Sequence, residues 1–159
     1  MYVSMKEMLL HAHNNKYAVM AINVVNMEQV KACIESAEEE KSAVILNISP
    51  RQMKAHAYPY IMAPMIKNLA ERASVPIALN LDHGVNYEDV VTCINSGYSS
   101  VMVDASSFAF EENIRRVQAI VTIAHAKGIS VEAELGHVGL AANSDGQNAD
   151  LYTDVKMAK

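Results

Sequence analysis

The chain has 159 residues, of which 51% are hydrophobic and 19% are charged, a composition ordinary for one globular domain with a sizeable core. Its formal net charge of −5 argues against a nucleic-acid partner, because the phosphate backbone repels an acidic surface. No apolar run approaches the roughly 20 residues of a membrane-spanning helix, and the N-terminus lacks the apolar core of a signal peptide. We therefore expect a cytoplasmic protein with neither a membrane nor a nucleic acid as its partner.

Both cysteines of the chain, Cys33 and Cys93, lie in helical patterns and are far apart in the sequence. Two such residues predict neither a disulfide framework nor a zinc knuckle, so we interpret them as thiols that pack as small apolar groups. The sequence also contains no Walker loop, no Gly-x-Gly-x-x-Gly fingerprint and no Gly-x-Ser-x-Gly elbow.

The N-terminal half alternates between helical and strand patterns. Ser4 is followed three residues later by Glu7, which is the signature of a capping box and predicts a helix that ends at Asn14 or Asn15. Pro64 lies inside a later helical pattern, where it predicts a kink or a split. The next predicted elements are a strand at 17–24, a helix at 27–41 capped by Asn26, a strand at 43–48, a linker that contains His56, and a helix at 58–73.

The second half continues the same alternation. Gly97 and Gly128 each come just after a helical pattern, where a left-handed cap is favoured. The predicted elements are a strand at 76–81, a helix at 87–96, a strand at 100–103, a helix at 110–127 and a strand at 129–134. Residues 136–150 are rich in Gly, Ala, Asn and Asp and predict a mobile loop, and 153–159 look like the first turns of another helix.

The five predicted strands are continuous apolar runs rather than alternating ones, which indicates a parallel sheet covered by helices. A closed (β/α)8 barrel needs eight strands and about 250 residues. The fold class is therefore α/β, either as an open five-stranded sheet or as the N-terminal portion of a barrel.

Polar side chains stand where these apolar strands end. Asp82 and His83 follow one strand, Asp104 follows the next, and Glu132 and Glu134 end the last. Charge has no reason to end a buried strand unless it is paired or coordinates a ligand. Because the carboxyl ends of parallel strands carry the chemistry of α/β barrels, we expect these groups to converge on one site. Asn23 and Ser49, at the ends of the two earlier strands, would complete a polar rim that binds substrate.

Each of these residues also has an ordinary structural interpretation. A lone histidine after a strand is more often a hydrogen-bonded structural residue than a metal ligand. Asp82 and Asp104 could cap turns, and the two glutamates could form a solvated edge. The adjacent acid and imidazole are stronger evidence than either alone, since one can transfer protons while the other binds a metal. Among the other histidines, His137 in the loop is the one further candidate for the site.

Several segments together resemble the class II, zinc-dependent bisphosphate aldolases, with the fructose/tagatose-bisphosphate branch as the nearest. The segments are 17–23 (YAVMAIN), 40–46 (EKSAVIL), 75–84 (VPIALNLDHG), 99–106 (SSVMVDAS), 110–113 (FEEN) and 131–136 (VEAELG). The resemblance covers essentially the whole chain. It implies that residues 1–159 are the N-terminal part of a single TIM-barrel aldolase domain, of which they cover about the first five βα units.

The resemblance also implies a function and roles for the polar residues. Such an enzyme cleaves a ketose 1,6-bisphosphate, fructose or tagatose, to dihydroxyacetone phosphate and glyceraldehyde 3-phosphate. His83 matches a zinc ligand, and Asp82 matches the acid/base that handles the C4 hydroxyl proton. Asp104 and Glu134 match an auxiliary metal site or an outer-shell role beside Zn²⁺, which leaves room for a second divalent or monovalent cation. A phosphorylated sugar is the implied partner, and a homodimer or homotetramer is the expected assembly.

The sequence departs from the family pattern in places, which leaves a second class of function open. The other two zinc histidines of the family come from strands beyond residue 159. Ser107 and Ala109 stand where the family usually has His and Pro, and 140–143 (LAAN) replaces a second Gly and acidic residues. The alternative is therefore a truncated, catalytically inactive half-barrel paralogue that serves as a binding or assembly module.

Overall fold

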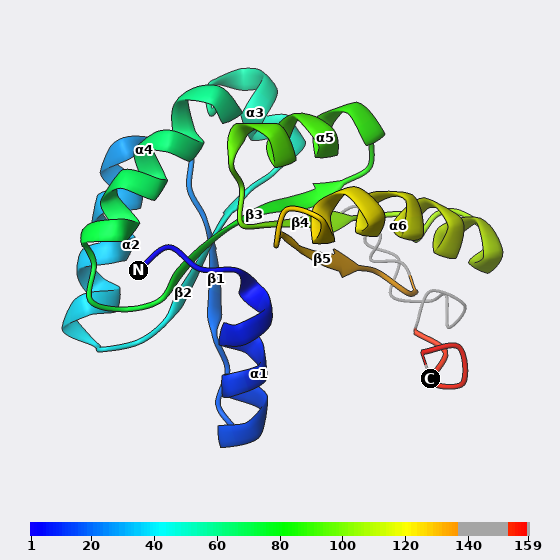
Figure 1. Ribbon diagram of the computed structural model, residues 1–159, viewed down its shortest axis with the longest axis horizontal. Coiled ribbons are helices and arrows are strands. Elements are labelled where there is room, and N and C mark those ends of the chain that lie inside the picture. The colour runs from blue at the N-terminus through cyan, green and yellow to red at the C-terminus, as the bar shows by residue number, and fades with distance from the viewer. Residues whose placement is uncertain (137–152, 159) are drawn as a thin grey trace, which may run out of the picture.

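The computed structural model describes residues 1–136 and 153–158 (Figure 1). The described strands are β1 (Met20–Asn23), β2 (Val44–Ile48), β3 (Ile77–Gly84), β4 (Ser100–Val103) and β5 (Ser130–Ala133). The described helices are α1 (Met5–Asn15), α2 (Met27–Glu39), α3 (Pro50–Ala55), α4 (Pro59–Arg72), α5 (Tyr87–Ser96) and α6 (Phe110–His125). None of the helices in this part of the chain is long and apolar enough to cross a membrane.

The strands form one parallel sheet in the order β1-β2-β3-β4-β5. Every strand therefore lies beside its neighbour in the chain, with helical crossovers between them. Open doubly wound sheets reverse their strand order at a switch point, whereas a (β/α)8 barrel keeps sequential order. The order thus decides between the two predicted architectures in favour of an arc of a barrel.

The outward face of the sheet carries the main hydrophobic core. Leu46 of β2, Leu79 of β3 and Val101 of β4 are fully buried there. Helices α2 to α6 cover this face in Figure 1, as right-handed crossovers on a twisted parallel sheet require. Period-2 alternation sends the intervening residues to the opposite, inward face.

Helix α1 packs on that inward face, at the end where the strands begin. Ser4 caps the helix by accepting a hydrogen bond from the Lys6 main chain, although the bond is 3.4 Å long. Met5 and Met8 are buried in a second, smaller cluster with Ile45 and Ala78, the inward residues of β2 and β3. The helix therefore covers the amino-terminal end of the barrel interior and leaves the carboxyl end open.

One helix was absent from the sequence prediction. The predicted linker between 49 and 58 contains α3, because Ser49 and Gln52 form a reciprocal capping box and Pro50 stands at its first helical position. Pro64 does not split α4, which is continuous. The carbonyl that loses its helical partner there belongs to Tyr60, an exposed residue near the start of the helix.

Two further regions bear on the predictions. Strands β1 and β5 form the edges of the described sheet, and Met20 at the start of β1 is 68% exposed. The predicted loop at 136–150 and His137 lie outside the described residues, apart from Gly136. Residues 155–158 form a turn in which Ala158 donates a main-chain hydrogen bond to Asp154.

Candidate metal centre at the carboxyl ends of the strands

The backbone around His83 takes an unusual course. The pairing register between β3 and β4 shifts between Leu81 and Gly84, so the ladder contains a bulge. His83 itself has a φ of +53°, in the left-handed region that non-glycine residues rarely adopt. Its main-chain N–H points to the Met102 sulfur at 3.4 Å instead of to a ladder carbonyl. Such strain is retained where the surroundings hold it, and functional sites are the usual place.

Gly84 permits this bulge because it has no side chain. A Cβ built at Gly84 would lie 2.5 Å from the carbonyl oxygen of Met102 and 2.8 Å from side-chain carbons of Leu81 and Val90. The close approach of β3 and β4 at this point therefore requires glycine. The histidine is thereby held over the ends of β4 and β5.

His83 meets two carboxylates there. Its Nδ1 lies 2.8 Å from Oδ2 of Asp104 and 3.4 Å from Oε2 of Glu134. One ligand atom from each of the three residues falls within 4.8 Å of the other two. The imidazole is half exposed, while both carboxylates are largely buried. The three groups thus form a cluster with an open side.

Electrostatics favour a cation in this cluster. The hydrogen bond to Asp104 raises the pKa of His83; burial opposes this rise, and the charges of Asp82, Asp104 and Glu134 add to it. Burial alone would raise the pKa of Asp104, but hydrogen bonds from Ser106 and His83 outweigh it and the pKa falls. Ser106 donates to Asp104 through its hydroxyl at 2.7 Å and its main chain at 3.2 Å. The site is therefore an anionic cradle around one imidazole.

The donor set fits a zinc ion. Imidazole nitrogen and carboxylate oxygen are both zinc ligands in proteins, and catalytic sites keep one position open for substrate. Carboxylates that do not bind the metal themselves also commonly accept a hydrogen bond from a metal-binding histidine. The same cluster can therefore hold a divalent cation directly or orient His83 toward one.

Asp82, the residue before the bulge, faces the interior of the arc. Its Oδ2 accepts a hydrogen bond from the side-chain amide of Asn23 on β1 at 3.1 Å, across the intervening strand β2. The same Asn23 amide points at Oε1 of Gln52 at 3.5 Å. Gln52 Oε1 in turn accepts the main-chain N–H of Ser49 at 2.8 Å. A chain of polar contacts thus joins the ends of β1, β2 and β3.

A second polar layer lies deeper on the inward face. The amide nitrogen of Asn80 donates to Asn47 at 3.3 Å and to Glu132 at 3.2 Å. Burial raises the pKa of Glu132, and the bond from Asn80 partly offsets this effect. With Asp82 and apolar side chains of α1, these residues line a cavity of about 480 Å³. A small polar substrate would find hydrogen-bonding groups along its wall.

The structure places the expected site residues in two adjacent groups: Asn23 bonds Asp82, and the next residue, His83, contacts Asp104 and Glu134. Glu132 lies apart from both groups, where it bonds Asn80. Ser49 lies one step away, where its hydroxyl accepts the Gln52 main-chain N–H at 3.4 Å and caps α3. Gln52 was missed by sequence reasoning, although the Ser-x-x-Gln spacing is a capping-box signal that could have found it. Asn47 and Asn80 were missed because a buried asparagine inside an apolar run carries no positional signal.

Comparison with known proteins identifies relatives of this chain. The sequence model described as class-II fructose-bisphosphate aldolase matches residues 3–159. A fructose-bisphosphate aldolase from Geobacillus stearothermophilus is 44% identical over 156 residues, which are 97% of this chain and 54% of that protein. One from Staphylococcus aureus (strain Mu50 / ATCC 700699) is 41% identical over 154 residues, or 96% of this chain and 52% of that protein. The chain spans about half the length of the curated relatives it matches.

A solved structure extends the likeness to the fold. The crystal structure of the YdjI aldolase from Escherichia coli K12 superposes with a TM-score of 0.85 at 35% identity, and the match covers 99% of this chain and 59% of that one. The match confirms the expectation that the chain corresponds to the N-terminal portion of a TIM barrel. The chain belongs to the class-II fructose-bisphosphate aldolase family.

Proposed function

We propose that the protein containing this chain is a zinc-dependent aldolase that cleaves fructose or tagatose 1,6-bisphosphate to dihydroxyacetone phosphate and glyceraldehyde 3-phosphate. In this proposal residues 1–159 form the N-terminal part of a single TIM-barrel domain, and the remaining strands supply further zinc ligands. The observation that carries it is the contact of His83 with Asp104 and Glu134, directly beside Asp82.

His83 is the zinc ligand that this chain contributes, and Asp104 and Glu134 orient it or hold an auxiliary cation. The half-exposed imidazole leaves a side of the cluster open to substrate. A bound zinc ion supplies Lewis-acid polarisation of the substrate ketone, so no lysine Schiff base is required.

Asp82 is the acid/base group. The amide of Asn23 holds one of its oxygens, and no hydrogen bond in the described residues engages the other, which can accept a proton from the C4 hydroxyl of the ketose. Asn23 and Ser49 are the proposed substrate-binding groups at the neighbouring strand ends. The Ser49 hydroxyl oxygen caps α3 by accepting the Gln52 main-chain N–H. Its own proton remains available to donate to a sugar phosphate or hydroxyl.

We further propose a cytoplasmic protein that assembles as a homodimer or homotetramer. Exposed apolar side chains near the start of α4, Tyr58, Tyr60 and Ile61, support association of copies. A catalytically inactive paralogue that serves as a binding or assembly module is the second candidate. The replacement of acidic family residues by LAAN at 140–143 favours it, since those carboxylates would be missing from the site.

The test is an aldol-cleavage assay of the complete protein with each ketose bisphosphate. We expect turnover that a chelator abolishes and added Zn²⁺ restores. Activity that survives the chelator, and that borohydride abolishes by trapping a Schiff base, would contradict the zinc mechanism. Zinc binding at His83 without any cleavage of either substrate would support the inactive paralogue.

A further inference from the structure

Glu134 follows directly after β5, the last strand of the described sheet. The ladder between β4 and β5 ends at the pair Val103 and Ala133. Strand β5 is an edge of the described sheet. Glu134 therefore lies just past the end of the paired region, yet its carboxylate reaches to 3.4 Å from Nδ1 of His83. A contact from outside the sheet also reaches the main chain at this point.

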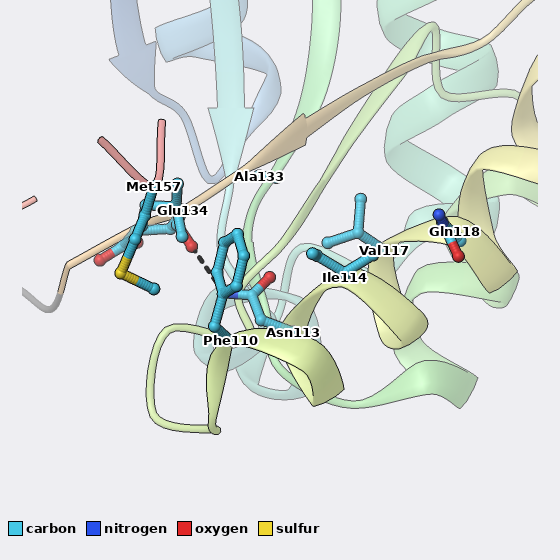
Figure 2. A pocket seen from close by; sticks show the side chains of 9 residues that line it. Phe110, Asn113, Ile114, Val117, Gln118, Ala133, Glu134 and Met157 are labelled. Atoms are coloured by element: carbon cyan, nitrogen blue, oxygen red, sulfur yellow. Dashed lines mark hydrogen bonds between the residues drawn. The ribbon is translucent and has the colours of Figure 1, made fainter. Parts of the chain in front are cut away.

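Asn113 of α6 provides such a contact. Its side-chain Nδ2 donates to the main-chain carbonyl of Glu134 at 2.9 Å, as Figure 2 shows. The asparagine is 6% exposed, and its own main-chain N–H bonds to Ala109 in the first turn of the helix. A buried amide costs free energy unless it is hydrogen-bonded, and asparagine is a poor residue for a helix interior. The bond to Glu134 accounts for a residue that packing alone would disfavour.

The surroundings of this bond are mostly apolar. A pocket of about 410 Å³ between α6 and the end of β5 is lined by Phe110, Ile114, Val117 and Leu135, among others. Apolar contacts set the separation of the helix and the strand but do not select one rotation of the main chain. A directional hydrogen bond does, and in a water-poor setting it is stronger than at the surface.

We infer that Asn113 is a positioning residue for the metal centre: it fixes the main chain of Glu134 so that the carboxylate meets His83. This inference rests on the proposed function, in which Glu134 supports metal binding. It assigns to α6, on the outer face of the sheet, an influence through Glu134 on metal affinity at the inner rim.

The test measures binding of Co²⁺ to the metal-stripped complete protein by its visible absorption, together with thermal unfolding of each variant. Asn113→Ala removes the donor, and Asn113→Asp keeps the shape but replaces the donor with an acceptor. Ser99→Ala is the matched control. Its buried hydroxyl also bonds the main chain, at Leu79 N (2.9 Å), but at the amino-terminal end of the strands.

We expect both Asn113 variants to bind Co²⁺ about 10- to 100-fold more weakly, the range typical for outer partners of metal ligands. Ser99→Ala should unfold at lower temperature and keep its Co²⁺ affinity. In a Glu134→Gln background, Asn113→Ala should cause no further loss, because its effect passes through Glu134. If Asn113→Ala fails to fold, Asn113→Asp serves the same comparison.

Two results would overturn the inference alone. One is normal Co²⁺ affinity in the Asn113 variants while Glu134→Gln and His83→Ala bind weakly. The other is an additive loss in the double variant. Normal affinity in His83→Ala would instead overturn the proposed function, and the inference with it.

Discussion

The two faces of the sheet use the same strands for different purposes. On the outward face, Leu46, Leu79 and Val101 are buried under the helices in an apolar core. On the inward face, Asn47, Asn80 and Glu132 occupy the alternate positions, and the Asn80 amide donates to both of the others. Burial of apolar area stabilises the first face, whereas the second contains groups that cost free energy unless they are paired. The comparison indicates that stability and chemistry should respond to separate substitutions one residue apart.

The outward face should give the largest loss of stability. Leu79→Ala removes a fully buried side chain from the main core, which costs about 2–5 kcal/mol in comparable sites. Metal affinity should remain unchanged because the side chain points away from the site. Denaturant unfolding and Co²⁺ titration of the complete protein measure the two quantities. A variant of normal stability with weakened metal binding would break the separation of the faces.

Gly84 packs against core side chains and directly follows His83, so its substitution should affect both stability and metal binding. Gly84→Ala places a methyl group against the Met102 carbonyl and the side chains of Leu81 and Val90. We expect a loss of about 1–3 kcal/mol from overpacking and, because His83 is the adjacent residue, weaker metal binding. An unaltered free energy of unfolding together with unaltered metal affinity would show that β3 and β4 can separate without disturbing the bulge.

The inward face should give a smaller loss of stability. Asn80→Ala leaves Asn47 and Glu132 without the amide that bonds them, at a cost of about 1–2 kcal/mol. It should also raise the pKa of Glu132 further, since the bond from Asn80 lowers that pKa. NMR titration of the Glu132 carboxyl carbon checks the direction. A lower pKa in the variant would contradict the account of this layer.

The pH dependence of metal binding should report on the protonation of His83. The pKa of His83 is raised, chiefly by Asp104, so protonation competes with the metal until the pH exceeds this raised value. In the metal-free protein, a rise in pH has the opposite effect on folding stability. The His83–Asp104 pair stabilises the fold fully below the ordinary histidine pKa, and this stabilisation is lost as the pH rises through the raised pKa. Asp104→Asn should lower the midpoint of the Co²⁺ affinity profile. An unchanged midpoint would exclude Asp104 as the cause.

The sequence predicted the strands well because each is a short apolar run between breakers, and it predicted their polar ends because charge is rare there. Helix α3 was missed because six residues contain too few turns to show periodicity. The choice between open sheet and barrel depended on strand order, which no local pattern encodes. The left-handed conformation of His83 and the bond from Asn113 to Glu134 depend on contacts between distant segments, and were visible only in the structure.

The central claim is that Asp82 transfers protons while its neighbour His83 binds the metal, and two variants of the complete protein test it. We measure zinc content and kcat for Asp82→Ala and His83→Ala. Asp82→Ala should keep its zinc and lose about 10²–10⁴-fold in kcat, roughly 3–5 kcal/mol of barrier. His83→Ala should lose zinc and activity together. An Asp82→Ala variant that turns over at the parental rate while His83→Ala is inactive would contradict the acid/base assignment and transfer that role to Glu132, Glu134 or a loop residue.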